Sequence, residues 1–390
     1  MKILILSFYY SPDLSAGSFR TSALVEELQL KLGVNDEIDI VTTMPNRYQK
    51  YRQDTLQYEK DGNVNIYRIK LSNHKSGFVD QSISYLFYAY NTIKYAKNKE
   101  YDLIYATSGR LFTGLLGAIL SRSKKVPLYL DIRDIFVDTM KSILPSYTRY
   151  IFIPFFSLVE KFTFRSASKI NIVSEGFRNY FKKIVPDMNL SFFTNGIDDE
   201  FFGNFYSDTN QVNEKIIITY AGNIGKGQGL ECIIPKISPF LGDEYEIRII
   251  GDGGSREALV KELDIIGAKN TVLIDPVSRD KLLNYYAESD FLFLHLNDVS
   301  AFEKVLPSKI FEYAVTGKPI LAGIKGYSRK FIKENVSGVM LFDPCDGNDF
   351  SSKFSSFKYE SVERIDFCKK YSRKTIMNKM ADDILSTKLL

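Results

Sequence analysis

The sequence contains few residues of the kinds that build disulfide frameworks or metal centres. Its 390 residues include three cysteines, Cys232, Cys345 and Cys368, and two histidines, His74 and His295. The cysteines are odd in number and show no Cys-x-x-Cys spacing, which excludes a disulfide framework and argues against a zinc site. Two histidines are too few for a multi-histidine metal centre. This usage fits a reducing cytoplasm, and we expect neither a metal nor another cofactor.

The sequence also lacks a long apolar run. The closest segment, Tyr150–Val159, has ten residues and is flanked by Arg149 and Glu160, whereas a membrane-spanning helix needs roughly 18 or more. The apolar start of the chain, Met1–Leu6, ends at Ser7 and is typical of a first β-strand rather than a secretory signal. We therefore expect no segment that spans a bilayer.

What is present is the composition of a folded globular protein. Hydrophobic residues make up 45% of the chain and charged residues 25%. A chain of this length favours two domains of roughly 150–200 residues each. The net charge is +4, but residues 1–195 hold 26 Lys and Arg against 18 Asp and Glu, whereas the remainder holds 25 against 29. A basic half can attract anionic lipid, pyrophosphate or nucleic acid, or it can be an ordinary solvated surface.

Short apolar runs alternate with helical patterns along the whole chain, which is typical of βαβ units and a parallel sheet. In the first half we predict strands at Lys2–Leu6, Glu37–Thr42, Val64–Arg68, Leu103–Thr107, Leu128–Ile132, Lys169–Val173 and Leu190–Phe193. The predicted helices there are Phe19–Leu32, Ser82–Lys97, Phe112–Arg122, Tyr147–Arg165 and Glu175–Lys183. In the second half we predict strands at Lys215–Tyr220, Tyr245–Ile250, Thr271–Ile274, Phe291–Leu296, Pro319–Ala322 and Gly338–Phe342, with helices that include Arg279–Ala287 and Ser308–Thr316.

The periodic pattern is interrupted once. It stops at Asn195–Asp198, and a polar segment, 203–214, follows, which we interpret as a domain linker. We therefore predict two Rossmann-like, doubly wound α/β domains, residues 1–200 and 201–370. A last segment, 371–390, is expected to be a helix that packs back on the N-terminal domain.

A glycine-rich loop follows the first predicted strand of the second domain. The segment Thr219–Leu230 contains four glycines between a strand and a helix. Such a loop exposes main-chain N–H groups beside a positive helix end, which suits a phosphate, although a tight structural turn is the equal alternative. Its spacing is not that of a P-loop. A second glycine turn, Gly251–Gly254, is a weaker signal and is more typical of a simple strand–helix turn.

The most informative segment is Leu306–Pro319. Pro307 and Ser308 are typical of a helix start and Gly317 of its end. Lys309 lies in the first turn, where a cation gains nothing from the helix dipole, so it is expected to serve an external anion such as a diphosphate. Glu312 lies on the same face and could accept two hydrogen bonds from a ribose diol. The alternative is an ordinary Lys–Glu pair within the helix.

Polar residues also stand at the carboxyl edge of the first predicted sheet, where open α/β sheets bind ligands. The segment Ser11–Arg20 follows the first strand, and Asp131, Arg133 and Asp134 lie at the end of a later strand. Three charges at one strand end are difficult to explain by core packing. A structural Arg–Asp pair remains the alternative.

Taken in order, these segments resemble the GT-B glycosyltransferases of family 4, and most closely its O-antigen subgroup typified by a putative L-fucosamine transferase. The resemblance covers essentially the whole chain. Its segments are Phe8–Pro12 with Gly17 and Arg20, Asp131–Asp134, Val173–Phe177, Asn195–Asp198, Tyr220–Gly225, Gly251–Gly253, and Pro307–Lys309 through Pro319.

The resemblance implies two Rossmann-like domains that face a central cleft. The second would hold a UDP-sugar donor, the first would bind the acceptor, and the sugar would be transferred with retention of configuration and without a metal. The donor-binding residues implied are Gly222, Asn223, Lys226, Gln228, Ser308, Lys309 and Glu312. Asp134 and Arg133 would line the cleft at the reacting groups, and Gly17, Arg20 and Asp131 would form the acceptor-side loop.

The chain departs from the family pattern at two places. Glu312 matches the second glutamate of the family's Glu-x7-Glu motif, but Lys304 stands where the first is expected, and Glu303 is one residue out of register. The family's phosphate-binding Arg and Lys correspond to Asn223 and Gln228. We therefore expect Lys309, together with Lys226, to supply the missing positive charge.

The acceptor and the location follow from the same resemblance and from the basic half. Aromatic stretches at Tyr85–Tyr90 and Tyr150–Phe156 are either core or a surface that seats this domain on anionic lipid, where a polyprenyl-diphosphate-linked saccharide would be found. We expect a cytoplasmic enzyme that is peripheral on the membrane and that does not bind nucleic acid. Two alternatives stay open: a non-hydrolysing UDP-sugar epimerase and a nucleotide-binding module without catalysis.

Overall fold

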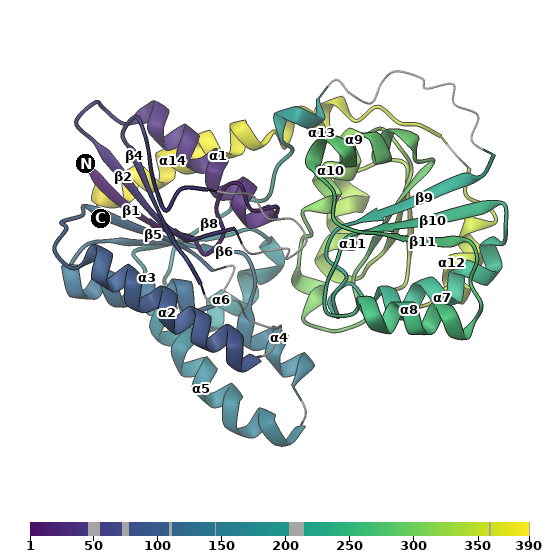
Figure 1. Ribbon diagram of the computed structural model, residues 1–390, viewed down its shortest axis with the longest axis horizontal. Helices are drawn as coiled ribbons and strands as arrows, with labels where there is room; N and C mark the ends of the chain where they lie inside the picture. Colours follow the sequence, from purple (N-terminus) through teal and green to yellow (C-terminus); the bar gives the residue numbers. More distant parts are fainter. Residues whose placement is uncertain are drawn as a thin grey trace. The chain divides into compact units, whose positions relative to one another are not determined.

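The computed structural model describes residues 1–45, 55–71, 78–108, 111–144, 146–202, 214–358 and 360–389. The chain folds into two compact units, coloured along the sequence in Figure 1. The first comprises Met1–Asn195 with Arg373–Leu390, and the second comprises Gly196–Ser372. Of the predicted linker 203–214, all but the last residue lies outside the described residues.

The first unit is built on an eight-stranded sheet in the order β3-β4-β2-β1-β5-β6-β7-β8, parallel except for β3. Ile3 to Leu6 are completely buried, because a parallel strand is covered on both faces and therefore reads as a continuous apolar run. The strands are β1 (Lys2–Leu6), β2 (Glu37–Thr43), β3 (Tyr58–Asp61), β4 (Val64–Ile69), β5 (Leu103–Thr107), β6 (Leu128–Ile132), β7 (Lys169–Ile172) and β8 (Leu190–Ser191).

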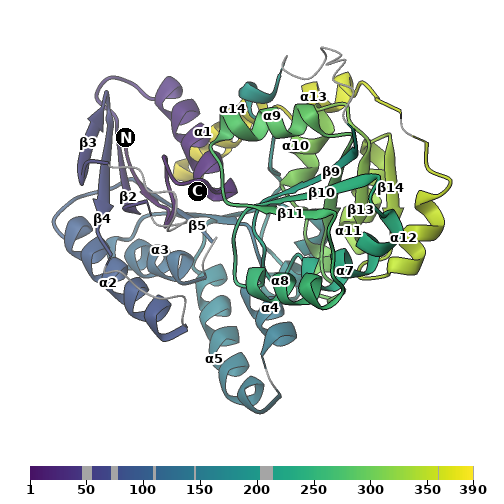
Figure 2. The same cartoon turned by 45° about the vertical axis from the view of Figure 1, so that its right-hand side comes forward.

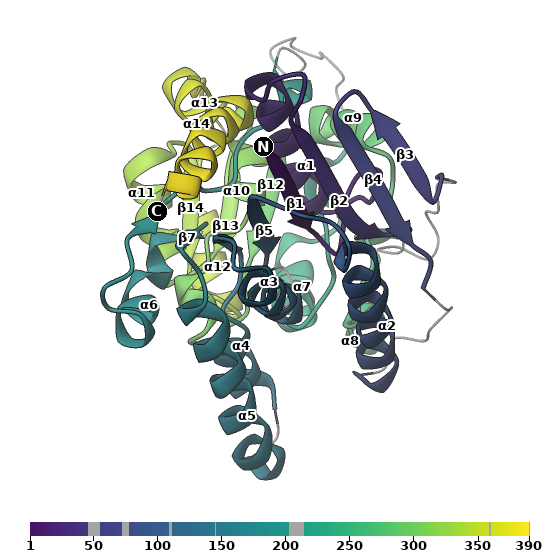
Figure 3. The same cartoon turned by 90° about the vertical axis from the view of Figure 1, so that its left-hand side faces the viewer.

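Helices cover both faces of this sheet. Figure 3 shows α1 and α14 on one face and α2, α3 and α5 on the other. The last helix is fixed by Asp383, whose carboxylate accepts hydrogen bonds from the hydroxyls of Tyr129 and Ser191 and pairs with Lys169. The helices are α1 (Ala16–Lys31), α2 (Phe78–Ala96), α3 (Leu111–Lys124), α4 (Phe136–Ile143), α5 (Ser146–Arg165), α6 (Arg178–Ile184) and α14 (Arg373–Ser386).

The second unit has a six-stranded parallel sheet in the order β11-β10-β9-β12-β13-β14. Figure 2 shows α7 and α8 on one face and α9, α10 and α13 on the other. The strands are β9 (Ile216–Ala221), β10 (Tyr245–Ile250), β11 (Thr271–Ile274), β12 (Phe291–His295), β13 (Ile320–Gly323) and β14 (Val339–Phe342). The helices are α7 (Leu230–Leu241), α8 (Arg256–Ile265), α9 (Arg279–Glu288), α10 (Lys309–Val315), α11 (Gly326–Asn335), α12 (Gly347–Phe354) and α13 (Ile365–Lys370).

The prediction of two doubly wound α/β folds is confirmed, with local differences. β3 was not predicted, because Tyr58–Asp61 is a largely exposed edge strand with no apolar alternation. The short helix α4 was also missed. α1 begins three residues before the predicted start, since the side chain of Ser15 caps it by accepting a hydrogen bond from the Ser18 N–H at 3.2 Å. No helix among the described residues is long and apolar enough to cross a membrane.

Candidate functional site

The strand order of the second unit places a ligand site at the ends of β9 and β12. Chain connections leave β9 toward β10 on one side and β12 toward β13 on the other, so this is where the strand order reverses. Open parallel sheets bind ligands outside the carboxyl ends of the strands at such a point. The glycine-rich loop 222–229 follows β9, and the segment after β12 leads to α10. Both predicted donor-binding segments therefore start from strands that flank this point.

The glycine-rich loop is held by hydrogen bonds within itself. The amide Nδ2 of Asn223 donates to Oε1 of Gln228 at 2.9 Å, and the same oxygen accepts from the Gly225 N–H at 3.2 Å. The hydroxyl of Tyr220 donates to the carbonyl of Asn223 at 2.6 Å. The two amide side chains thus hold the loop together.

Lys309 lies directly against this loop. A Cβ built on Gly222 would stand 2.3 Å from the Lys309 Nζ, and Gly222 has a φ of +144°, so only glycine suits the position. The ammonium lies 5.5 Å from the ring centre of Tyr220 and 6.0 Å from that of Tyr313. Among the described residues it forms no hydrogen bond and no ion pair. Burial lowers the pKa of Lys309, and the charge of Glu312 acts in the opposite direction.

Glu312 stands on the same helix but does not pair with Lys309. Its carboxylate oxygen Oε2 accepts a long hydrogen bond from the hydroxyl of Tyr286, at 3.4 Å. The carboxylate also acts electrostatically on Arg279, which pairs with Asp198 and with Glu200. The alternative of an intrahelical Lys309–Glu312 pair is therefore not what the structure shows. The carboxylate is half-buried and has capacity for further donors.

The other predicted donor residues are placed as follows. Ser308 is the residue before α10, and its side chain makes no capping hydrogen bond. Lys226 is exposed on the glycine-rich loop. Glu303 and Lys304 lie in the short 3-10 helix η3 (Phe302–Lys304), with Glu303 exposed and Lys304 half-buried.

The second glycine turn, Gly251–Gly254, packs against the backbone of the glycine-rich loop. A Cβ on Gly251 would lie 1.8 Å from the carbonyl oxygen of Gly222, and one on Gly253 would lie 2.4 Å from that of Ile224. The Ile224 N–H donates to the Asp252 carbonyl at 2.9 Å. Close backbone approach therefore explains Gly251 and Gly253, which fits the simpler alternative of a strand–helix turn.

In the first unit, Arg20 and Asp131 form a buried structural pair. Both side chains are 0% exposed, and the guanidinium is bidentate, with Nε at 2.8 Å and Nη2 at 3.0 Å from the carboxylate. Tyr105 and Asn171 donate the remaining hydrogen bonds to Asp131. Burial acts to raise the pKa of Asp131, but the charge and hydrogen bonds of Arg20 outweigh it and hold the pKa below its usual value.

This pair corrects the expectation that Arg20 and Asp131 face the acceptor. Arg20 also donates to the carbonyls of Phe193 and Thr194, at 2.8 and 2.7 Å. It therefore ties α1 and β6 to the end of the first unit. With no exposed surface, neither side chain can contact a substrate, so Arg20 and Asp131 have a structural role.

Arg133 lies against Gly17, and the charges of Asp134 and Asp131 act on it. A Cβ on Gly17 would lie 2.0 Å from Nη1 of Arg133. The main-chain N–H of Arg133 donates to Oγ of Ser108 at 3.1 Å. Asp134 is exposed at the end of β6. Two of the predicted residues of the first unit thus remain available to a ligand at its sheet edge, and Gly17 leaves room for Arg133.

Sequence reasoning missed the role of His295 at the end of β12. It is 1% exposed, its Nδ1 lies 2.6 Å from the Gln228 carbonyl, and its Nε2 accepts from the Cys345 N–H at 2.9 Å. Nδ1 must therefore carry the proton, and the ring is neutral. Burial lowers the pKa of His295 to about 4. The ring is hydrogen-bonded to the glycine-rich loop and holds it in place. The sequence did not indicate this role, because it shows only a single histidine at the end of an apolar strand.

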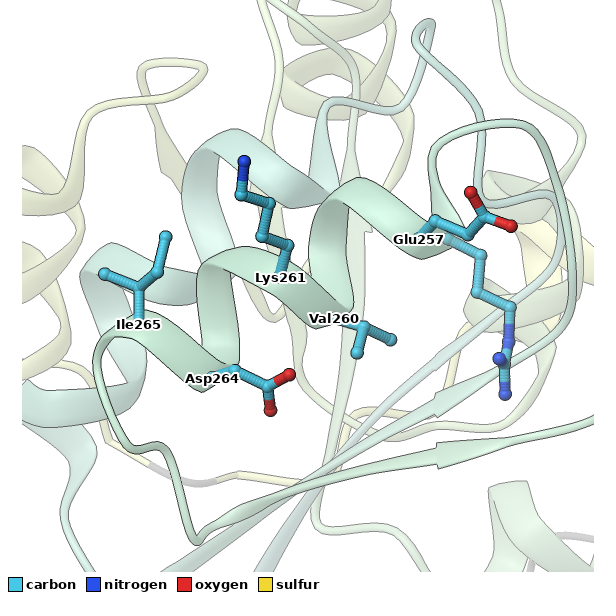
Figure 4. Close-up of a pocket in the computed structure, with 6 residues that line it drawn as sticks. Glu257, Val260, Lys261, Asp264 and Ile265 are labelled. Carbon is cyan, nitrogen blue, oxygen red and sulfur yellow. The ribbon is translucent and has the colours of Figure 1, made fainter.

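A surface hollow beside α8 is not part of the site. Figure 4 shows its labelled side chains, Glu257, Val260, Lys261, Asp264 and Ile265, all rising from one helix. A binding site usually gathers polar groups from several elements around a concave apolar surface. In the described part of the chain, no group of three or more His, Cys, Asp and Glu side chains could hold a metal ion.

Comparison with known proteins identifies the fold. Residues 204–375 match the family model described as glycosyl transferases group 1. No curated protein matches the chain in sequence. The chain is similar in structure to sucrose-phosphate synthase from Thermosynechococcus elongatus, with 12% identity, a TM-score of 0.71, and coverage of 100% of this chain and 96% of that one.

Two further solved structures are similar over their whole length. HepE of Anabaena, solved in complex with UDP and glucose, has 15% identity and a TM-score of 0.68, and covers 99% of this chain and 100% of its own. The lipopolysaccharide outer core galactosyltransferase WaaB has 13% identity and a TM-score of 0.63, and covers 100% of both chains. The predicted GT-B fold is confirmed, and together with the match of the second unit to the glycosyl transferases group 1 family it supports a glycosyltransferase.

Proposed function

We propose that the chain transfers a sugar from a UDP-sugar to a lipid-linked saccharide during assembly of a bacterial surface polysaccharide such as O-antigen, capsule or exopolysaccharide. The transfer retains the anomeric configuration and uses no metal. The donor sugar is N-acetyl-L-fucosamine or another amino or deoxy sugar, as the subgroup resemblance implies. The enzyme works on the cytoplasmic face of the membrane.

The observation that carries the donor assignment is the position of Lys309. An ammonium with no ion pair among the described residues lies on a glycine that admits it, beside a loop whose cation positions are taken by Asn223 and Gln228. A half-buried lysine is desolvated at a cost, and a diphosphate would offset that cost. Glu312, three residues further along the helix, offers acceptors for the ribose diol of the same nucleotide. HepE, which has this fold, binds UDP and UDP-glucose.

The chemistry follows from where charge develops. As the bond between the sugar and the diphosphate breaks, negative charge grows on the departing phosphate, and Lys309 would stabilise it more strongly in the transition state than in the ground state. Asp134 and Arg133 would contact the reacting sugar or the acceptor. No residue is assigned as a nucleophile.

Membrane association rests on the outer surface of α2 and α5. Figure 3 shows α5 extending beyond the sheet of the first unit. Large apolar side chains are exposed on both helices, among them Ile83, Leu86, Phe87 and Tyr90 on α2, and Tyr147, Tyr150, Ile151, Phe155 and Leu158 on α5. Large apolar side chains exposed along a helix are typical of a surface that meets a membrane or another protein.

The charges on α5 fit an anionic lipid surface. Arg149, Lys161 and Arg165 are exposed, whereas Glu160, its one acidic residue, is buried and accepts a hydrogen bond from the Val137 N–H. Apolar side chains would insert at the headgroup level and the cations would meet lipid phosphates. This would bring a lipid-linked acceptor to the first unit.

The test is a donor screen. Purified protein is incubated with a panel of UDP-sugars and a prenyl-diphosphate-linked saccharide, the product is identified by mass spectrometry, and its anomeric configuration is read by NMR. Transfer with retention supports the proposal. Hydrolysis or epimerisation of every donor without transfer would contradict it.

The epimerase alternative is weakened because His295 is not available as an acid or base. Such an enzyme needs acid–base groups at the sugar, but His295 is neutral and has both ring nitrogens engaged. His74 lies outside the described residues. The donor screen includes this alternative, because an epimerase would change the UDP-sugar in the absence of acceptor.

A further inference from the structure

Two of the three cysteines come together in the second unit. Cys232 lies in the first turn of α7, and Cys345 lies in the turn between β14 and α12, beside α7 (Figure 1). Lys236 contacts both residues, because its Nζ donates hydrogen bonds to the Cys232 Sγ at 3.9 Å and to the Cys345 carbonyl at 2.8 Å. The fold therefore joins two cysteines that are far apart in the sequence.

The two thiols interact and can be reached from solvent. Burial raises the pKa of the Cys345 thiol, and a hydrogen bond with the side chain of Cys232 acts in the same direction. Both residues are half-buried, and both are free thiols. Cys345 lines a surface hollow of about 760 Å³ together with Lys236, Asp298 and Asp346. A small oxidant can therefore enter the hollow and meet the pair.

The backbone of Cys345 has a conformation that cysteine rarely adopts. Its φ is +59°, in the left-handed region, where an L-residue with a side chain is disfavoured by roughly 1–2 kcal/mol. Glycine would occupy this position without that cost. Residues held in such a conformation are found most often at functional sites. The turn thus keeps a thiol where glycine would be favoured, which indicates a role for the sulfur.

The pair is also connected to the glycine-rich loop 222–229. The Cys345 Sγ donates a hydrogen bond to Oδ1 of Asn297 at 3.4 Å, and Nδ2 of Asn297 donates to the Lys226 carbonyl at 2.8 Å. A Cβ on Gly229 would stand 2.9 Å from Cγ of Asn297, so this side chain packs directly against the loop. The Cys232 N–H donates to the Gly229 carbonyl at 3.1 Å. A displacement of either cysteine is therefore transmitted to the loop.

We propose that Cys232 and Cys345 form a reversible disulfide when the protein meets a peroxide, and that this disulfide displaces the glycine-rich loop and weakens nucleotide binding. An S–S bond is much shorter than a contact between two thiols, so its formation draws the Cys345 sulfur away from Asn297. In a reducing compartment such disulfides are transient and serve redox sensing. The inference rests on the proposed function only for the nucleotide.

The reaction balances with hydrogen peroxide as the oxidant. The Cys232 sulfur, which lies beside the ammonium of Lys236, attacks a peroxide oxygen; the O–O bond breaks, a sulfenic acid forms and water leaves. The Cys345 sulfur then attacks the sulfenic sulfur, so that the S–S bond forms, the S–O bond breaks, and the thiol proton leaves with the hydroxyl group as a second water. The cysteines lose two protons and two electrons, and the peroxide is reduced to two waters.

The experiment uses the full-length protein and three variants. Cys232→Ser and Cys345→Ser each remove one sulfur of the pair, whereas Cys368→Ala, the matched control, removes the buried cysteine of α13 and keeps the pair. Each protein is treated with hydrogen peroxide, with or without dithiothreitol afterwards. Free thiols are alkylated and the disulfide is located by peptide mass spectrometry. The loop is followed by hydrogen exchange of peptides that contain residues 222–229, and UDP affinity is measured by calorimetry.

We expect the wild type and Cys368→Ala to form the Cys232–Cys345 disulfide and to exchange the loop amides faster once oxidised. They should then bind UDP about tenfold more weakly, roughly the effect of losing one hydrogen bond. Dithiothreitol should restore the exchange rate and the affinity. In both serine variants, peroxide should change neither property.

Three results would overturn the proposal: no Cys232–Cys345 disulfide after peroxide treatment, a disulfide that leaves loop exchange unchanged, or the same measurable UDP affinity in the reduced and the oxidised protein. Failure of the proposed function gives a different result. If the reduced protein binds no UDP while the disulfide still forms and accelerates loop exchange, the nucleotide assignment fails and the redox control of the loop stands.

Discussion

Replacing Lys309 by methionine separates a diphosphate-binding lysine from a structural one. Methionine keeps most of the unbranched chain that lies over Gly222 and removes only the charge. The ammonium makes no ion pair to the described residues and lies over the rings of Tyr220 and Tyr313. Loss of the cation–π contacts costs about 0.5–1 kcal/mol, and relief of desolvation offsets it, so the free energy of unfolding should change by less than about 1 kcal/mol.

The effect on ligand binding should be larger and selective. A hydrogen bond to a charged group contributes about 1.5–3 kcal/mol, which corresponds to about a 10- to 150-fold change in Kd. Lys309→Met should therefore weaken UDP by about this factor and leave uridine within about twofold, since uridine has no diphosphate. Because charge on the departing phosphate grows in the transition state, kcat/KM for sugar transfer should fall further than UDP affinity.

Calorimetric titration of both ligands into both proteins measures the difference. Lys226→Met is the matched control, because Lys226 is an exposed lysine of the adjoining loop, and it should change UDP binding by a smaller factor. Equal weakening of UDP and uridine by Lys309→Met would refute the phosphate role. A selective loss with Lys226→Met alone would transfer that role to the loop.

Four other outcomes are expected. Glu312→Ala should weaken UDP and uridine alike by about 2–3 kcal/mol, because both contain the ribose diol, and unchanged affinity for both would exclude that contact. Sugar transfer should survive excess EDTA, and a loss that magnesium restores would contradict a metal-independent reaction. Burial lowers the pKa of His295 from 6.5 to about 4, so the unfolded chain binds a proton at a higher pH than the folded protein does. The free energy of unfolding should therefore fall by up to about 3 kcal/mol as the pH drops from 6.5 to 4. Chemical denaturation curves of His295→Gln should lack this pH dependence. Phe155→Glu on α5 should reduce sedimentation with anionic vesicles without changing UDP affinity, whereas Lys236→Glu, in the second unit, should bind vesicles as the wild type does.

The sequence predicts the two sheets well because their central strands are buried on both faces. Ile3 to Leu6 and Phe291 to Leu294 are nearly fully buried, so each position had to be apolar and the pattern was visible. The strand Tyr58–Asp61 pairs with β4 at one edge and is mostly exposed. Its residues were not constrained by a core, and periodicity could not identify it.

The candidate site was predictable in its local part only. Lys309 and Glu312 are three residues apart on one short helix, and the sequence indicated both. That Lys309 reaches across to Gly222 depends on a strand order that brings β9 beside β12, 70 residues further along the chain. The hydrogen bond of His295 to the carbonyl of Gln228 in the same loop also depends on the pairing of β9 with β12.

Arg20 and Arg133 show why charge at a sheet edge does not by itself indicate a ligand site. Both are predicted there, and both lie near the first turns of α1. Arg20 is enclosed by the carboxylate of Asp131 and two main-chain carbonyls, so its donors are used within the fold. Arg133 follows β6, and its Nε is buried without a hydrogen-bond partner in the described structure. The buried pair stabilises the edge of the sheet, whereas Arg133 lies at the end of β6, where the charges of Asp134 and Asp131 act on it.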